Sequence, residues 1–221
     1  MKKFAFFLAL PVFAQNLPTQ KVLLENEFVR VLDIHYAPGI VEGVHSHKHG
    51  VTIAMSDYDN ETKTVPEGKV NQGHTKFGRV AWNEPVTHEA HNTGTTEQHV
   101  VRIEIKKDAP PVQVAAANYD PLDSLIVCKE TQKLLFENDY VRAMEAHVPS
   151  GGGEPKHHHG NGITVVMADY ESEITAFADG PNRKVTRTHA SKGDVHWAAP
   201  VTHSTRNVGS GEMYVVRIDI K

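Results

Sequence analysis

Two stretches of the chain, GRVAWNEPVTHEAHNTG at residues 78–94 and GDVHWAAPVTHSTRNVG at residues 193–209, are versions of one sequence. Both carry a tryptophan, then Pro-Val-Thr-His, then an asparagine, at the same spacing. Two further pairs recur in the same order: HGVTIAMSDYDNE (49–61) with NGITVVMADYESE (161–173), and VVRIEIK (100–106) with VVRIDIK (215–221). Self-similarity over this length indicates one structural unit that is encoded twice.

The duplication divides the chain into two copies and a connector. The first copy covers residues 21–106, the connector covers 107–132, and the second copy covers 133–221. The connector is rich in Pro, Asn and Asp, which interrupt regular structure. Its last part, SLIVCK at 124–129, is predicted to add a strand. Cys128, the single cysteine, lies in this apolar run and is expected to be a buried, unreactive thiol.

Each copy has the pattern of an all-β protein. FVRVLDIHY at 28–36 and YVRAMEAHV at 140–148 alternate between inward and outward residues with a period of two, as strands do. Short β-branched runs such as VTIAM at 51–55 are bounded by Gly, Asn, Asp and Pro. No segment keeps a 3.6-residue period. We therefore predict a sandwich or small β-barrel in each copy, with the two packed about a pseudo-twofold axis like a fused homodimer.

The composition and the N-terminus bear on partners and location. The 221 residues carry a net charge of −4, and the sequence has no cluster of Arg or Lys, which argues against a nucleic-acid partner. Residues 1–14, MKKFAFFLALPVFA, combine two lysines, an apolar run too short to cross a bilayer, and small residues before a cut after Ala14. We expect a signal peptide, and an exported protein (periplasmic or secreted) with no membrane attachment after cleavage. A buried first strand is the alternative.

The duplication also sorts the fifteen histidines. Residues i and i+2 of a strand face the same side, so His45 and His47 can hold one metal ion. His88, distant in sequence, is the expected third ligand. An isolated His-x-His more often lies on a solvated loop, but this one recurs together with its remote histidine. The predicted ligand sets are His45, His47 and His88 in the first copy, and His157, His159 and His203 in the second.

At these positions the chain resembles the cupins, a superfamily of small metal-binding β-barrels. The first cupin motif has a glycine, five intervening residues and then His-x-His, and Gly39 and Gly151 occupy the position of that glycine here. Four residues of the first copy match the second motif: Gly78, Pro85, His88 and Asn92. Their counterparts in the second copy match it as well: Gly193, Pro200, His203 and Asn207. The Gly-to-Pro gap of this motif is one residue longer here, and the glycine after the proline is absent. The resemblance implies a bicupin, with two tandem jelly-roll barrels of the double-stranded β-helix type.

The chain departs from the family at its glutamate ligand. The family pattern places that residue at Val51 or Thr52, and at Ile163 or Thr164, where neither copy has a carboxylate. The resemblance then implies a three-histidine centre, which some cupin dioxygenases use, and counts against the oxalate-degrading bicupins. Imidazole ligands favour Fe(II) as the divalent transition metal, with Zn, Ni or Cu as alternatives, and disfavour manganese.

Several other residues are expected near the substrate. Thr52 and Thr164 stand at the place of the missing glutamate. Trp82 and Trp197 precede the proline of the second motif, where barrel packing is the alternative to a substrate contact. Arg206 replaces a histidine of the first copy and is predicted to bind an anion beside the second metal.

Three more duplicated pairs are interpreted from their positions. Glu42 and Glu154 lie three residues before the first ligand and are interpreted as solvent-facing loop acids, with a substitute ligand or a base as the alternative. His35 and His147 are expected on the outer face of their strand. Asn92 and Asn207 are expected to fix a turn.

The function predicted from these residues is that of an exported, metal-dependent enzyme. A three-histidine Fe(II) centre is suited to a dioxygenase that cleaves a small oxygenated substrate such as a diketone, an enediol or a diol. Isomerase or lyase chemistry is the lesser option. The alternative from a different class is a non-catalytic cupin that binds a metal, a sugar or a small organic acid. The expected partners are a small-molecule substrate and further copies of the chain in a homo-oligomer.

Overall fold

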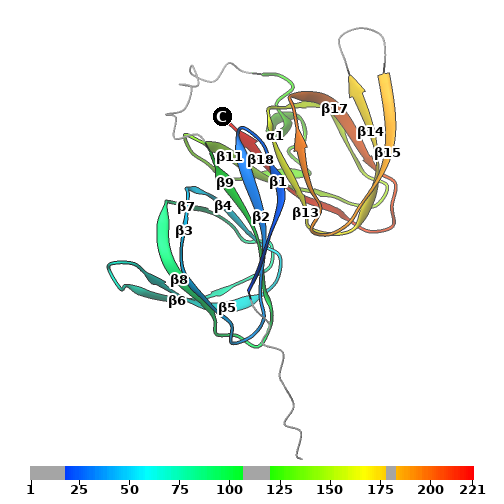
Figure 1. Cartoon of the computed structure of the whole chain (residues 1–221). Coiled ribbons are helices and arrows are strands. Elements are labelled where there is room, and N and C mark those ends of the chain that lie inside the picture. The colour runs from blue at the N-terminus through cyan, green and yellow to red at the C-terminus, as the bar shows by residue number, and fades with distance from the viewer. Residues whose placement is uncertain (1–17, 107–119, 178–182) are drawn as a thin grey trace, which may run out of the picture.

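The computed structural model describes residues 18–106, 120–177 and 183–221 (Figure 1). The predicted signal peptide at 1–14 and the connector residues 107–119 lie outside the described residues. The described elements of the first copy are β1 (Thr19–Glu25), β2 (Val29–Tyr36), β3 (Val41–His47), β4 (Gly50–Ala54), β5 (Tyr58–Thr64), β6 (Val70–Thr75), β7 (Val80–Asn83), β8 (Val86–Asn92) and β9 (Gln98–Ile105). Those that follow are α1 (Ser124–Val127), β10 (Gln132–Glu137), β11 (Val141–Val148), β12 (Gly153–His159), β13 (Gly162–Val166), β14 (Tyr170–Phe177), β15 (Arg183–Ala190), β16 (Val195–Ala198), β17 (Val201–Asn207) and β18 (Met213–Ile220).

Each copy forms one barrel from two sheets (Figure 1). In the first copy the strand orders are β1-β2-β9-β4-β7 and β3-β8-β5-β6. In the second copy they are β10-β11-β18-β13-β16 and β12-β17-β14-β15, which is the same pattern strand for strand. The predicted all-β fold with two tandem barrels related by duplication is confirmed.

The five-stranded sheets of the two barrels pack against each other through a shared core. Because side chains alternate along a strand, β2 directs Leu32 and Ile34 into the interior of the first barrel. The same strand directs Val29 and Val31 into a cluster that also contains Ile163 and other buried residues of the second copy. Burial on both faces explains why these central strands carry β-branched residues on both sides.

Aromatic residues link the two barrels reciprocally. The ring of Phe28 in the first copy stacks on Trp197 of the second, with centroids 5.2 Å apart. Tyr140, the counterpart of Phe28, stacks on Trp82 of the first copy at 5.3 Å. A twofold relation between the copies requires this exchange of identical contacts. The two indoles therefore pack between barrels and do not line either cavity described below, so the expected substrate contacts of Trp82 and Trp197 are corrected to barrel packing.

The described end of the connector forms a helix where the apolar run predicted a strand. Asp123 begins α1, and its side chain accepts a hydrogen bond from the backbone N–H of Leu125. An aspartate at this position satisfies an N–H that has no partner within the helix, and this cap outweighs the β-propensity of SLIV. The helix packs on β10 and β12, and the predicted strand is wrong. No helix among the described residues combines the length and the hydrophobicity that a membrane span requires.

Candidate metal sites

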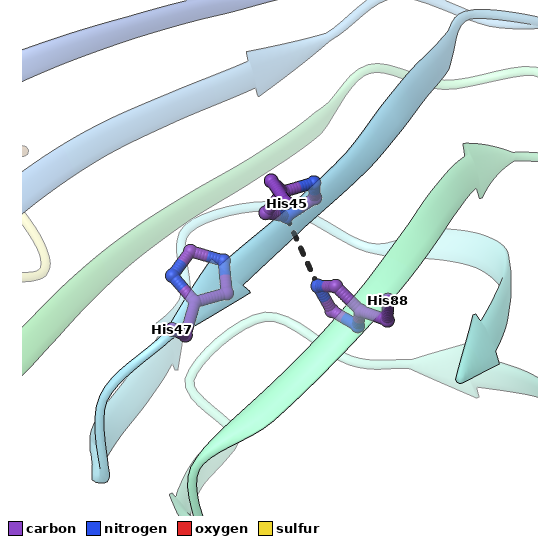
Figure 2. A group of neighbouring side chains, drawn as sticks. All are labelled: His45, His47 and His88. Atoms are coloured by element: carbon purple, nitrogen blue, oxygen red, sulfur yellow. Dashed lines mark hydrogen bonds between the residues drawn. The ribbon is translucent and has the colours of Figure 1, made fainter. Parts of the chain in front are cut away.

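Three histidines converge inside the first barrel. Adjacent strands β3 and β8 pair so that His45 lies directly opposite His88. Figure 2 shows these two rings, together with that of His47 from the end of β3, turned toward a common point. The Nε2 atoms of His45 and His88 are 3.0 Å apart, and the three donor atoms lie within 4.8 Å of one another.

The second barrel repeats this arrangement in a more buried setting. His157 on β12 lies opposite His203 on β17, and their Nε2 atoms are 2.9 Å apart. The donor atoms of His157, His159 and His203 also lie within 4.8 Å of one another. His157 is fully buried and His159 is 7% exposed. His158, the middle member of the triplet, points the other way and contacts Thr202. The structure thus brings together both predicted ligand sets.

The geometry of these nitrogens fits a metal ion. Two nitrogens bound at roughly 2.1 Å on adjacent corners of an octahedron lie about 3.0 Å apart, which is the separation found in both barrels. The first histidine of each pair also has its tautomer fixed. The Nδ1–H of His45 donates to the carbonyl of Gly43 at 2.8 Å, and that of His157 donates to the carbonyl of Pro155 at 2.7 Å. Their Nε2 lone pairs are therefore available to a metal.

The remote histidine of each set is held neutral by its surroundings. Burial, reinforced by the neighbouring histidines, lowers the pKa of His88 to about 4 and the pKa of His203 to about 3. Both imidazoles are therefore uncharged at neutral pH. A histidine must be deprotonated to bind a metal, so neither residue needs to lose a proton first.

A carboxylate stands beside each histidine set, contrary to the expectation of solvent-facing acids. The strand register shifts between Glu42 and His45, and equally between Glu154 and His157. A β-bulge inserts an extra residue and re-aims the side chains that follow, so the glutamate and the histidine three positions on both face inward. Glu42 Oε2 is 3.2 Å from His45 Nε2, and Glu154 Oε2 is 3.9 Å from His157 Nε2. Glu154 is only 6% exposed, so its interpretation as a loop acid is wrong.

Both glutamates are fixed by further hydrogen bonds. Glu154 accepts from Thr131 and from the amide of Gln132, each at 2.9 Å. Glu42 accepts from the hydroxyl of Tyr36 and from Gln20, the counterpart of Gln132. Burial raises the pKa of Glu42 above its ordinary value. Each barrel can therefore offer three imidazole nitrogens and one carboxyl group to an ion.

A second carboxylate stands behind His47 in the first barrel and behind His159 in the second, but of the two pairs only Glu104–His47 is hydrogen-bonded. Glu104 on β9 accepts a hydrogen bond from His47 Nδ1 at 2.9 Å, whereas Asp219 on β18 is 3.8 Å from His159 Nδ1. Burial tends to raise the pKa of both carboxyls, but the adjacent histidine and arginine outweigh it, so both pKa values lie below the ordinary range. The Glu104–His47 hydrogen bond is of the kind that fixes the ring of a ligand and strengthens it.

A buried arginine, absent from the sequence-based prediction, lies beside each set. Arg102 donates from Nη1 to Thr52 at 3.1 Å, and Arg217 donates in the same way to Thr164 at 3.3 Å. Both threonines line the cavities as expected. Arg206 instead alternates with inward-facing residues on β17 and is exposed, so its predicted role beside the second metal is corrected. The duplicated arginine within each apolar VVRI run was the available signal.

A cavity opens at each histidine set. Its volume is about 350 Å³ in the first barrel and about 530 Å³ in the second, both within the range of small-molecule sites. Cys128 packs behind the second set, with Sγ 3.3 Å from His157 Nδ1. The prediction of a buried thiol is confirmed, and burial raises the pKa of Cys128 to about 12.

A third group of donors lies outside both cavities. Asp33 is 2.8 Å from His99 Nε2 and 3.2 Å from His35 Nε2, and the two imidazole rings stack at 3.9 Å. In the second copy, His147 stacks in the same way on Tyr214. His35 and His147 therefore lie on the outer face of their strands, as predicted.

Comparison with known proteins identifies the fold. No family model and no curated protein matches the sequence. AerE from Microcystis aeruginosa is 13% identical over 92% of this chain and 98% of its own, with a TM-score of 0.62. Oxalate decarboxylase from Lactobacillus farciminis, in complex with formate, is 11% identical over 94% of this chain and 86% of its own, with a TM-score of 0.60. The chain is a bicupin in fold. A structure of Bacillus subtilis oxalate decarboxylase, a protein with Mn(II) centres, is 9% identical over 94% of this chain and 78% of its own, with a TM-score of 0.58.

Proposed function

We propose that this bicupin is an exported metalloenzyme in which both histidine sets bind a divalent transition metal. We further propose that the metal is Fe(II) and that the enzyme is a dioxygenase acting on a small oxygenated substrate. The observation that carries the proposal is the convergence of three imidazole nitrogens at the end of a cavity in both barrels. At identities of 9–13% the solved structures support the fold and not the reaction.

The donor set bears on which metal is bound. Three neutral imidazoles favour Fe, Cu, Ni and Zn over Mn. Glu42 and Glu154 add a hard oxygen donor close to each set. Because Mn(II) prefers oxygen ligands, this donor reduces the preference for the other metals over Mn(II). Mn(II) is therefore the main competitor of Fe(II) in the metal analysis below.

The residues around the second site suggest how the chain would assist the reaction. When bound, the metal would supply a Lewis acid that holds and polarises oxygen groups of the substrate. Glu154, fixed by Thr131 and Gln132, is placed to take or return a proton at the inner end of the cavity. The largely apolar wall would exclude water from this end, and Arg217 would offset the negative charge of an oxygenated substrate.

Metal content and oxygen uptake test this proposal together. The mature, untagged protein should carry close to two equivalents of metal, mainly iron when purified without oxygen, and should consume O₂ with a member of a diketone and diol panel. His45→Ala and His157→Ala should each remove one equivalent. Two bound metals without turnover would favour the non-catalytic alternative. Metal no higher than in the His45→Ala/His157→Ala double variant would refute both metal sites.

Export is a separate part of the proposal. The lysine pair, the apolar run and the small residues before position 15 support a cleaved leader at residues 1–14. Mass spectrometry of the protein recovered from a periplasmic or culture fraction should give an N-terminus at Gln15. Recovery of the intact N-terminus in the cytoplasm would contradict export.

A further inference from the structure

We infer that the two barrels select ligands of different polarity. The first would take a small hydroxylated acid, and the second a small acid with an apolar chain or ring. This inference rests on the proposed function in one respect, since it places the acid's oxygen-bearing head at the metal. The polarity of the body of the ligand is argued from the cavity walls alone.

The inner ends of the two cavities are alike. Both contain a threonine hydroxyl held by a buried arginine. Tyr58 and Tyr170 also line the cavities, but each lies six residues along its strand from the residue that pairs with the remote histidine. Together with the histidines, the threonine and the arginine form a similar surface for the head of a ligand. Differences in ligand class must therefore arise from the residues around this surface, beginning with Asn83, whose amide donates to Thr52 at 2.8 Å in the first barrel and is replaced by Ala198 in the second.

The walls differ in polarity at five duplicated positions. Ala90/Thr205 is apolar in the first cavity and polar in the second, whereas the other four pairs are polar in the first and apolar in the second. These four pairs are Thr62/Ile174, Asn83/Ala198, Glu84/Ala199 and Gln98/Met213. They come from three separate segments of each barrel, so a single local rearrangement does not explain them. An apolar wall binds apolar surface, because that surface leaves water on binding.

The size of the cavities changes together with their polarity. Two of the four replacements in the second barrel, Ala198 and Ala199, shorten the side chain, and Ala146 stands where the first barrel has Ile34. The second cavity accordingly has about 530 Å³ against about 350 Å³ in the first. The extra space is bordered by methyl and thioether groups, among them those of Met144 and Met213.

Buried polar atoms without partners indicate what each ligand must offer. Gln98 is 7% exposed, and its Oε1 has no hydrogen-bond partner among the described residues. Leaving such an atom unpaired is costly, so a hydroxyl donor on the ligand of the first barrel would stabilise the complex. In the second cavity Met213 replaces this amide, and the lining residues with unpartnered atoms are Gln132 (Oε1, beside Glu154), Ser172 (Oγ) and His159 (Nδ1). The second ligand is therefore apolar along its body but also carries a hydrogen-bonding group.

A matched pair of six-carbon acids tests this inference. 2-Hydroxyhexanoate and gluconate share the same 2-hydroxy acid head and differ in the hydroxyl groups of the chain. Calorimetry would use Zn(II)-loaded full-length protein, since zinc binds oxygen ligands without redox chemistry. His88→Ala would leave the second site intact, and His203→Ala the first. We expect the second site to prefer 2-hydroxyhexanoate and the first to prefer gluconate, each by at least about tenfold.

A chain-length series and a reciprocal exchange of wall residues sharpen the test. From 2-hydroxypropanoate to 2-hydroxyoctanoate, affinity at the second site should rise about threefold to fourfold per methylene, and affinity at the first should stay nearly level. Ile174→Thr with Met213→Gln should flatten the series at the second site. Thr62→Ile with Gln98→Met should steepen it at the first. Each introduced residue already occupies the equivalent position of the other barrel, and thermal unfolding would verify that the variants fold.

The outcomes separate this inference from the proposed function. Equal preferences at the two sites, or a series that the exchanges leave unchanged, would overturn it whatever the enzyme does. If the acids bind as expected but O₂ is not consumed, the proposed dioxygenase activity would be refuted, and the inference on the ligand class of each barrel would stand. If the protein binds no Zn(II), the titration would use metal-free protein, with 1-hexanol as the ligand in place of the acids. Its binding should weaken at least threefold in Ile174→Thr/Met213→Gln, and an unchanged affinity, or no binding to the wild type, would overturn the inference.

Discussion

The two barrels hold their histidines in the same geometry but enclose them differently. In the second barrel the segment before β10 packs behind β12: the backbone N–H of His158 donates to Leu122, and Cys128 contacts His157. His157 is fully buried there, whereas the His45 side chain remains 20% exposed. The counterparts of Leu122 and Cys128 in the first copy are Leu10 and Asn16, which lie outside the described residues. Among the described residues, two copies of one motif thus have different environments.

The largest expected difference between the barrels concerns loss of the first ligand. His45→Ala and His157→Ala should each weaken metal binding at their own site by more than about 100-fold. Loss of a direct ligand should cost more than the roughly 10-fold to 100-fold that follows loss of a residue that only orients a ligand. His157→Ala should also lower the free energy of unfolding by roughly 2 kcal/mol, because it empties a fully buried position. Chelator competition and urea unfolding measure the two effects. Equal destabilisation by the two variants would contradict the difference in enclosure.

The contact between the barrels should respond nearly as strongly. Trp82→Ala and Trp197→Ala each remove an indole that stacks across the interface, with an expected loss of roughly 2–4 kcal/mol in the free energy of unfolding. Trp82→Ala should cost more, since the indole of Trp82 also contacts His49, a contact without an equivalent in the second copy. Both variants should retain two metal equivalents. Loss of metal binding in either variant would contradict this assignment and show that the indoles contribute to the metal sites.

A smaller effect is expected from replacing the carboxylates that lie behind His47 and His159. Glu104 lies within hydrogen-bonding distance of His47, whereas Asp219 is 3.8 Å from His159. Glu104→Gln should therefore weaken metal binding at the first site by about 10-fold to 100-fold. Asp219→Asn should weaken binding at the second site by less. The reverse order in a chelator titration would show that the longer distance does not reflect a weaker interaction.

The smallest effect concerns Cys128, which contacts the second site alone. Because burial raises its pKa to about 12, little thiolate exists at pH 8, and the thiolate is the nucleophile. Iodoacetamide should leave native protein unmodified over hours and alkylate it readily in denaturant. His157→Ala should increase native labelling, whereas His45→Ala should not. Rapid labelling of the wild type would contradict the packing of α1 against β12.

The duplication, the two β-barrels and the convergence of the six histidines could be predicted from the sequence. The spacing of the motifs and the two-residue alternation of the strands carry that information directly. The sequence was not sufficient for Glu42 and Glu154, because a β-bulge changes which face a residue occupies and leaves no signature in the residue pattern. Arg206 was misplaced for a related reason, since its inward or outward direction depends on the strand register. The helix at 124–127 depends on one capping aspartate, whose side chain outweighs four apolar residues.

The most direct test of a metal centre in each barrel is anomalous diffraction from crystals of the metal-loaded, untagged protein. The structure predicts two strong peaks, one about 2.0–2.2 Å from the Nε2 atoms of His45, His47 and His88, and one equally close to those of His157, His159 and His203. A carboxylate oxygen of Glu42 or Glu154 should approach each peak. No peak at either set, or the strongest peak at Asp33, His35 and His99, would contradict the assignment of the metal centres to the barrel interiors.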